Sequence, residues 1–190
     1  GGVSGSGNPT TSWCAGNMNL VADRTNATLI TDALLFPYSK AIGIYKCPGN
    51  RRDMLRGVSM NTFMGNDGGG NKTLAYYYLK TTAIRKPSEL FVTMDEDDGT
   101  INDPAFLVRV FKNTFLNIVN LNMADWPATY HAKSGGISFA DGHAEMHSWK
   151  VLGPPPAGYA PNAQNSVPNS ADLTYLQRIS SQPINPGPGW

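Results

Sequence analysis

A β-hairpin is predicted by residues 130–149, which read Tyr130-His131-Ala132-Lys133-Ser134-Gly135-Gly136-Ile137-Ser138-Phe139-Ala140-Asp141-Gly142-His143-Ala144-Glu145-Met146-His147-Ser148-Trp149. Apolar and polar residues alternate on both sides of Asp141-Gly142. This dipeptide favours the two-residue type I′ turn, because both turn positions need positive φ. If these two residues form the loop, the register follows by counting. The predicted pairs are Ala140 with His143, Phe139 with Ala144, Ser138 with Glu145, and Ile137 with Met146.

The two faces of this hairpin differ in composition. Side chains alternate between faces along a strand, so one face, which we assign to the core, carries Ile137, Phe139, Ala144 and Met146. The other face carries Ser138, Ala140, His143, Glu145, His147 and Trp149. The three histidines of the chain, His131, His143 and His147, all lie in or beside the hairpin.

The composition indicates one loop-rich domain. A chain of 190 residues can bury a core that needs no metal or set of disulfides to fold. Charged residues make up 15% of the chain, against about a quarter in ordinary domains. With 20 glycines and 14 prolines, this favours an extracytoplasmic protein. The net charge is +1 and no basic cluster exceeds Arg51-Arg52, so nucleic-acid binding is not supported. No stretch has the length of a transmembrane helix, and no signal peptide is visible.

Local patterns elsewhere predict an α+β fold with an antiparallel sheet, short helices and long loops. A helix is expected from Thr28 to Leu35, ended or bent by Pro37. A second is expected near 170–179, with Ser170 as N-cap and an apolar stripe of Leu173, Leu176 and Ile179. Strands are expected at 58–64, 74–79, 90–94, 106–111 and 115–121. We divide the chain into a flexible lead-in (1–12), a globular head (13–152) and a Pro/Asn-rich extension (153–190) whose helix packs on the head.

The chain has two cysteines, Cys14 and Cys47. In an extracytoplasmic protein they would form one disulfide closing a long loop. The alternative is two buried free thiols, and we favour the disulfide.

The histidine-rich hairpin suggests a metal site. His131, Asp141 and His143 are candidate ligands, because imidazole and carboxylate bind zinc and similar ions. His143 and His147 are four residues apart on a strand, about 13 Å, which is too far to share one ion. In the alternative, which we favour, Asp141 supplies turn hydrogen bonds and His131 holds its loop in place.

A second candidate cation site lies between Asp95 and Asp103. Calcium binds several carboxylate and carbonyl oxygens, and the candidates here are Asp95, Glu96, Asp98 and Asp103. The order of an EF-hand is missing, because Met94 occupies the position of the first ligand when Gly99 is aligned with the loop glycine. A solvated turn at the end of a strand is the alternative that we favour.

Nucleophilic catalysis has no support in local motifs. No Gly-x-Ser-x-Gly elbow occurs, and neither cysteine has the local signature of a nucleophile. We therefore predict no catalytic residue, no enzyme activity and no required cofactor, with calcium as the one possible ion. Residues 76–78, three successive tyrosines, and Trp149 could form a sugar-stacking platform, although aromatic residues in strands more often pack in a core.

Several motifs resemble one known family. His131, nine intervening residues and Asp141-Gly142 resemble the signature of the prepilin-type processing-associated domain of bacterial type IV pilin-like and type II secretion pseudopilin-like proteins. Four further stretches resemble the same family in its order, and together they cover most of residues 40–180. They are Tyr45-Lys46-Cys47-Pro48 with Val58-Ser59-Met60-Asn61, Lys86 to Glu96, Thr100 to Asp103, and Asp172 to Arg178.

The resemblance implies a long N-terminal helix, hydrophobic in its first half, packed on an antiparallel sheet. It also implies anchoring in the membrane by that helix, and assembly with other pilin-like subunits or secretion-system components at the cell envelope. This chain lacks the helix and its processing site, so we expect a soluble portion whose anchor was removed or left out. The family supplies no catalytic residues to carry over.

Three functions follow as hypotheses. The leading one is the soluble head of a membrane-anchored, pilin-like subunit with a structural role, which presents the loops 65–73, 96–105 and 153–169. The second is a secreted or surface binding module, calcium-dependent and carbohydrate-directed. The third is a metal-dependent hydrolase built on His131, Asp141 and His143.

Overall fold

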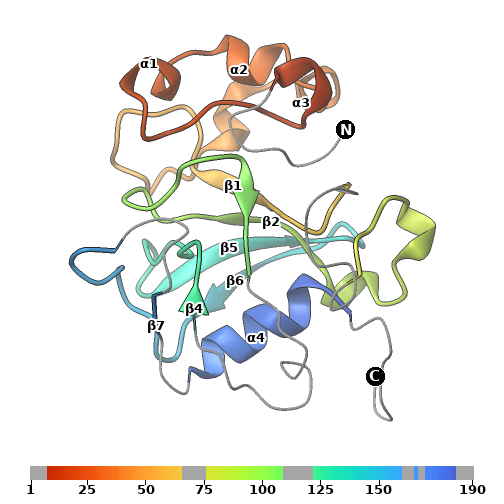
Figure 1. Ribbon diagram of the computed structural model, residues 1–190, viewed down its shortest axis with the longest axis vertical. Coiled ribbons are helices and arrows are strands. Elements are labelled where there is room, and N and C mark those ends of the chain that lie inside the picture. The colour runs from red at the N-terminus through yellow and green to blue at the C-terminus, as the bar shows by residue number, and fades with distance from the viewer. Residues whose placement is uncertain (1–7, 66–75, 109–121, 160–164, 167–169, 183–190) are drawn as a thin grey trace.

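The computed structural model describes residues 8–65, 76–108, 122–159, 165–166 and 170–182. Five strands form the main sheet, in the order β3-β1-β2-β5-β6 (Figure 1). They are β1 (Val58–Asn61), β2 (Phe91–Asp95), β3 (Ala105–Phe106), β5 (Ser134–Phe139) and β6 (Ala144–Ser148). A second sheet pairs β4 (Asn122–Met123) with β7 (Asn165–Ser166). The β1–β3 pair is parallel and the other strand pairs are antiparallel. The fold class is therefore α+β, with a mixed sheet where an antiparallel one was expected.

Short helices dominate the chain before β1. They are η1 (Pro9–Thr11), α1 (Val21–Arg24), α2 (Thr28–Thr31), α3 (Phe36–Ser39) and η2 (Ile42–Tyr45). The helix expected from Thr28 to Leu35 therefore ends early, at Thr31. Pro37 lies in the first turn of α3, where its missing N–H has no intrahelical partner to lose. The prediction that this proline ends or bends the helix that begins at Thr28 was wrong, because that helix ends before it.

The C-terminal helix confirms its prediction. After η3 (Thr81–Ala83) and η4 (Pro87–Glu89), which precede β2, the last helix is α4 (Ala171–Ser180). The Ser170 hydroxyl accepts the Leu173 N–H at 3.2 Å, as an N-cap does. The predicted stripe is buried, with Leu173 and Leu176 at 0% exposure and Ile179 at 6%.

The other predicted strands are confirmed only in part. β1 and β2 confirm the strands at 58–64 and 90–94, although β1 is shorter. The strand at 74–79 does not form over its described part, which contributes only an isolated bridge between Met64 and Tyr78. β3 ends at Phe106. Residues 109–111, and the whole strand expected at 115–121, lie outside the described residues.

The hairpin forms, but its register differs by one residue from the prediction. The observed pairs are Ser138 with Ala144, Ile137 with Glu145, Gly136 with Met146, Gly135 with His147 and Ser134 with Ser148. The loop has three residues, 140–142, because the Phe139 N–H donates to the His143 carbonyl at 2.9 Å. Gly142 has φ of 94°, whereas Asp141 is not at positive φ. A turn followed by a glycine at positive φ is the usual three-residue hairpin loop, so the type I′ prediction was wrong.

This one-residue shift turns every side chain of β6 to the other face. Ile137 and Phe139 are buried as predicted, at 2% and 5% exposure. Met146 is 54% exposed and Ala144 is exposed, so their assignment to the core was wrong. Trp149 is buried at 4% exposure in their place.

The sheet lies between two helical layers (Figure 1). α4 covers one face, and the main core lies between them, formed by Phe91, Met94, Phe106, Val108, Met123, Trp126, Ile137, Phe139, Trp149, Leu152, Leu173, Leu176 and Ile179. The segment with α1–α3 and η2 covers part of the other face. A second cluster forms there, with Trp13, Cys14, Ile30, Ala33, Tyr45 and Met60.

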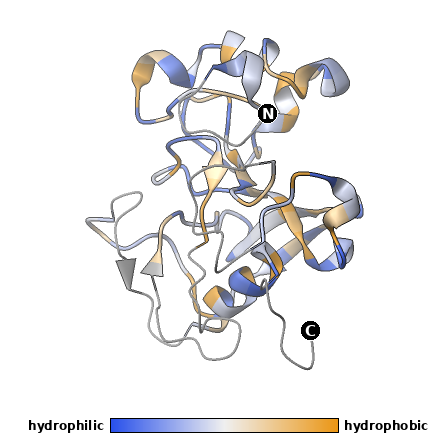
Figure 2. Ribbon diagram, turned by 45° about the vertical axis from the view of Figure 1, so that its right-hand side comes forward, coloured by the Kyte–Doolittle hydropathy of each residue, from blue (hydrophilic) through white to orange (hydrophobic). Residues whose placement is uncertain are grey.

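Hydrophobic residues are not confined to these cores. Figure 2 shows hydrophobic stretches in the N-terminal helical segment as well as in the strands. Large apolar side chains are exposed there, including Val21 at 76%, Tyr38 at 86% and Ile44 at 64%. Among the described residues, no helix has the length and apolar character needed to cross a membrane.

Candidate functional site

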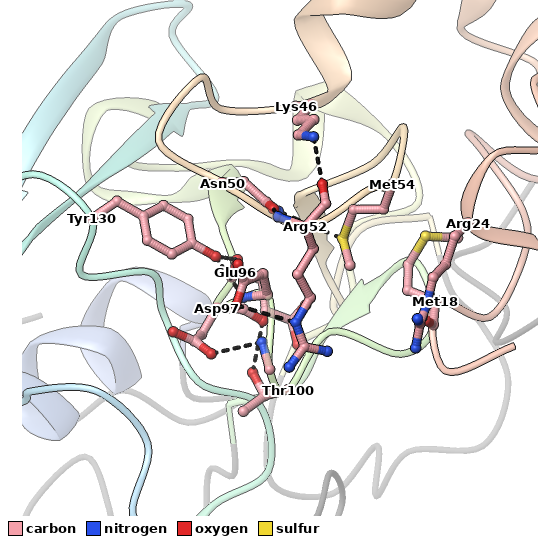
Figure 3. Close-up of polar contacts among 12 residues, drawn as sticks. Met18, Arg24, Lys46, Asn50, Arg52, Met54, Glu96, Asp97, Thr100 and Tyr130 are labelled. Atoms are coloured by element: carbon pink, nitrogen blue, oxygen red, sulfur yellow. Dashed lines mark hydrogen bonds and ion pairs between the residues drawn. The ribbon is translucent and has the colours of Figure 1, made fainter. Parts of the chain in front are cut away.

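The acidic turn that follows β2 is held in place by hydrogen bonds to neighbouring loops (Figure 3). The Tyr130 hydroxyl accepts the Asp98 N–H and donates to the Glu96 carbonyl. Asp97 Oδ1 accepts the backbone N–H two residues further on at 2.8 Å. Arg52 Nε lies 3.6 Å from Asp98 Oδ1. These contacts use the acidic side chains to fix the turn.

The four carboxylates considered for calcium are engaged in separate contacts. Asp95 and Glu96 are neighbours at the end of β2, so their side chains point to opposite faces of the sheet. Asp95 Oδ2 accepts the Gly136 N–H at 3.0 Å, whereas Glu96 is fully buried. Asp98 lies beside the Arg52 guanidinium. Asp103 Oδ1 accepts the Ala105 N–H at 2.9 Å. The turn therefore does not collect them around one point.

Glu96 lies beside a second buried carboxylate, on the face of the sheet that α4 covers. It has 0% exposure, and its neighbour Asp125 has 3%. Burial raises the pKa of the Glu96 carboxyl well above its ordinary value, and the charge of Asp125 raises it further. The buried Arg56 is close enough to lower that pKa, although less strongly. The Arg56 guanidinium donates to the carbonyls of Val58, Gly16 and Asn102 and to the Ser59 hydroxyl.

The structure brings together a thiol, an imidazole and a carboxylate on the opposite face. His131 Nε2 lies 3.1 Å from Cys47 Sγ, and the Gly49 N–H donates to the same sulfur at 3.3 Å. Burial raises the pKa of the Cys47 thiol, and the nearby Asp95 carboxylate adds to this effect. A raised thiol pKa disfavours the thiolate, which is the nucleophilic and metal-binding form of cysteine. The contact joins two loops that lie 84 residues apart in the sequence.

An unusual turn positions His131 over Cys47. The two residues after His131, Ala132 and Lys133, have φ of 49° and 64°, a conformation that costs non-glycine residues of the order of 1 kcal/mol each. The His131 and Ser134 backbones bond to each other across this turn, at 3.3 and 3.0 Å. Two successive residues at positive φ, as expected for Asp141-Gly142, thus occur at this end of β5, whereas at Asp141-Gly142 only the glycine has positive φ.

The predicted metal set is not assembled. His143 Nδ1 lies 2.6 Å from Asp141 Oδ1, and this hydrogen bond lowers the pKa of the Asp141 carboxyl. His131, however, lies at the other end of β5, whose six residues span about 17 Å. Within the part of the chain that the structure describes, no group of three or more His, Cys, Asp or Glu side chains is arranged to hold a metal ion.

The two cysteines are free thiols, so the expected disulfide is not formed. Cys14 is fully buried in the cluster under the N-terminal helices, beside Trp13 and Ile30. Burial raises the pKa of its thiol to about 12. Cys47 instead contacts the His131 imidazole.

The aromatic residues considered for sugar stacking are largely used in packing. Tyr78 is 5% exposed, and the Trp149 Nε1–H donates to the Ala128 carbonyl at 2.9 Å. His147 stacks on Tyr175 of α4, with ring centroids 3.9 Å apart and planes 6° apart. The Tyr175 hydroxyl donates to Glu145 Oε1 at 2.8 Å. These contacts between β6 and α4 were not predicted from the sequence, because the predicted register turned His147 away from the core.

Part of the sheet face opposite α4 forms an open apolar surface. Two cavities of about 340 Å³ each adjoin there, because Val58 and Thr93 line both. The first also has walls from Met94, Asp95, Gly136, Ile137, Ser138, Ala144, Glu145 and Met146. The second is completed by Trp13, Leu35, Tyr38, Ser39, Ile44 and Tyr45. Together they make a groove from α3 to β6, which we call the sheet groove.

The sequence contained partial signals for these features. Cys47 and His131 each belong to a recognisable motif, but nothing in the sequence places those motifs in contact. The apolar residues Leu35, Tyr38 and Ile44 showed no pattern that marks them as exposed. Comparisons of the chain with protein-family models, with curated proteins and with solved structures return no match.

Proposed function

We propose that this chain is the globular head of a pilin-like subunit with a structural, non-enzymatic role in a cell-envelope filament or a type II secretion-like system. In this proposal the complete protein is extracytoplasmic and anchored in the membrane by a hydrophobic helix. Its partners are other pilin-like subunits or components of the secretion system. The motif series that begins at Tyr45 and includes the stretch from His131 to Gly142 favours this function.

The observation that carries the proposal is the sheet groove. Its walls are mainly apolar, and its floor residues Val58, Thr93 and Ser138 are only half-buried. No described element covers this part of the sheet, whereas α4 covers the opposite face completely enough to bury Phe91 and Ile137. An apolar groove beside a partly covered sheet is a typical place for another element to pack.

The dimensions of the groove suit one α-helix. Strands in a sheet are about 4.8 Å apart, so the three steps from β1 to β6 span about 14 Å. A helix with its side chains is about 10–12 Å across. The exposed Tyr38, Ile44 and Met146 lie along the groove, where they would contact such a helix.

The complete gene provides the first test. We expect a short basic leader and about twenty consecutive apolar residues to be encoded upstream of Gly1. A cleavable secretory signal with no apolar segment after it would contradict the proposal.

Thiol accessibility tests the position of the helix. Ser138→Cys places a thiol on the floor of the groove, and Val151→Cys, at a position 59% exposed, serves as the matched control. We expect a bulky maleimide to label Ser138→Cys in the 190-residue chain but not in the full-length protein, while Val151→Cys is labelled in both. Equal labelling of Ser138→Cys in both proteins would show that no helix lies in the groove.

A further inference from the structure

The outer edge of β6 is an uncovered sheet edge. Strand order places β6 last in the main sheet. The Phe139 N–H donates to the His143 carbonyl at 2.9 Å, and the Trp149 N–H donates to the Lys133 carbonyl at 2.8 Å. Backbone groups alternate in direction along an antiparallel strand, so the odd-numbered residues of β6 bond to β5. The residues whose N–H and C=O groups point away from the sheet are Ala144, Met146 and Ser148.

This edge has few of the features that usually prevent pairing between sheets. Natural edge strands are protected by charged side chains, above all lysine, by proline, by a bulge or by a covering segment, and Glu145 is the one acidic side chain of β6. β6 reads Ala-Glu-Met-His-Ser, without lysine or proline, and it pairs with β5 over all five residues without a register shift. Four of its residues are exposed, and its backbone has no hydrogen-bond partner on the outer side among the described residues.

We propose that β6 pairs with β6 of a second copy of this chain, antiparallel about a two-fold axis at Met146. The two sheets would then join into one sheet of ten strands. In this register Met146 faces Met146 of the other copy, Ala144 faces Ser148, and Glu145 faces His147. The inference goes beyond the proposed function, since it needs no anchoring helix.

The side chains of β6 are self-complementary in this arrangement. An isologous contact requires that each residue tolerate the residue related to it by the axis. Here a carboxylate faces an imidazole on both sides of the axis, and two thioethers meet at its centre. Cross-strand pairs of opposite charge and of apolar residues stabilise a sheet, whereas like charges directly opposite destabilise it. A shift of one residue would place Glu145 opposite Met146 and lose this match.

The key side chains already have fixed positions in one copy. Glu145 is held by the Tyr175 hydroxyl at 2.8 Å, and His147 is held by its stack on the Tyr175 ring. Both lie on the α4 face, whereas Met146 lies on the open face, where it lines the sheet groove. Pairing therefore orders few side chains that are free in the monomer, which lowers its entropic cost.

Disulfide trapping tests the register directly. Two Met146 positions across the axis would form a hydrogen-bonded pair with Cα atoms about 5.5 Å apart, within the range of about 4.4–6.8 Å that a disulfide spans. We expect Met146→Cys to form covalent dimers rapidly under mild oxidation, at a protein concentration where Tyr38→Cys, 86% exposed, does not. The wild-type chain, whose two thiols are buried, gives the background. Equal trapping of both variants would overturn the proposal.

Sedimentation equilibrium tests the interaction without a new covalent bond. We expect a reversible monomer–dimer equilibrium for the wild-type chain, and a dissociation constant raised about tenfold or more by Met146→Lys, which places two cations at the axis. Glu145→Lys and His147→Glu should each weaken the dimer, and the double variant should restore it, because it again places a carboxylate opposite a nitrogen donor. Circular dichroism checks that each variant keeps its fold. A wild-type chain that stays monomeric at millimolar concentration, or a double variant weaker than both single variants, would overturn the proposal.

Discussion

Asp172→Ala is expected to destabilise the protein strongly, because one buried carboxylate holds the chain that follows β6. Asp172 is 1% exposed and lies in the first turn of α4. Its Oδ1 accepts the Lys150 N–H at 2.9 Å, and its Oδ2 accepts the N–H groups of Val151 and Leu152 at 2.7 and 2.8 Å. The substitution removes all three hydrogen bonds at once.

The size of the effect depends on what replaces each bond. The Leu152 N–H is buried and would lose its partner outright, at about 2–3 kcal/mol. Lys150 and Val151 are exposed, so water can bond their N–H groups and each loss is about 0.5–1 kcal/mol. The carboxylate also interacts favourably with the N-terminus of α4, worth about 0.5 kcal/mol. The free energy of unfolding should therefore fall by about 4 kcal/mol in total.

Urea denaturation followed by tryptophan fluorescence measures this change, and a thermal melt gives a second estimate. In a chain of this length, about 4 kcal/mol corresponds to a decrease in Tm of about 10 °C. Asp172→Asn keeps one acceptor oxygen and should lose about half as much. Asp32→Ala, at an exposed carboxylate that accepts a hydrogen bond from the neighbouring Thr31 hydroxyl, is the control and should change the free energy by less than about 0.5 kcal/mol. A loss below about 1 kcal/mol for Asp172→Ala would refute the reasoning.

Three further predictions address other parts of the structure. Because the pKa of Glu96 is raised in the folded protein, stability present at acid pH is lost as pH rises through that pKa. Glu96→Gln should therefore gain stability relative to wild type as pH rises from 4 to 9, and a pH-independent difference between their urea midpoints would contradict this. Gly49→Ala should lower Tm, since its Cβ would lie 2.8 Å from the Tyr130 Cβ, whereas Gly43→Ala, with open space around it, should not. Met146→Gln should change the free energy of unfolding by less than about 0.5 kcal/mol; a loss of about 2 kcal/mol or more in urea denaturation would favour the type I′ register.

Elements with strong local signals could be predicted from the sequence. α4 follows from Ser170 and the spacing of Leu173, Leu176 and Ile179, because a cap and a 3.6-residue period involve only nearby residues. β2 and the hairpin follow likewise from apolar runs and from Asp141-Gly142. Pro37 misled the prediction for the N-terminal helices, because proline is compatible both with the end of one helix and with the first turn of another.

The register of the hairpin depended on packing. Two loops, of two and three residues, are both compatible with Asp141-Gly142, and they bury opposite faces of β6. The observed register buries Trp149 and stacks His147 on Tyr175, while Met146 stays exposed. In this register a buried tryptophan and an aromatic stack take the place of a buried alanine and methionine. The observed register depends on the contact between His147 and Tyr175 of α4. The sequence of β6 alone carries no information about that contact.

The sequence by itself determined where α4, β2 and the hairpin form, because caps, turns and alternation are properties of adjacent residues. Only the tertiary structure decided which face of β6 is buried and that β3 pairs with β1 in parallel. It also decided that His131 contacts Cys47 across 84 residues, while Asp141 and His143 lie at the far end of β5. The physical reason is that contacts between distant segments depend on the path of the whole chain and on which arrangement buries the most apolar surface.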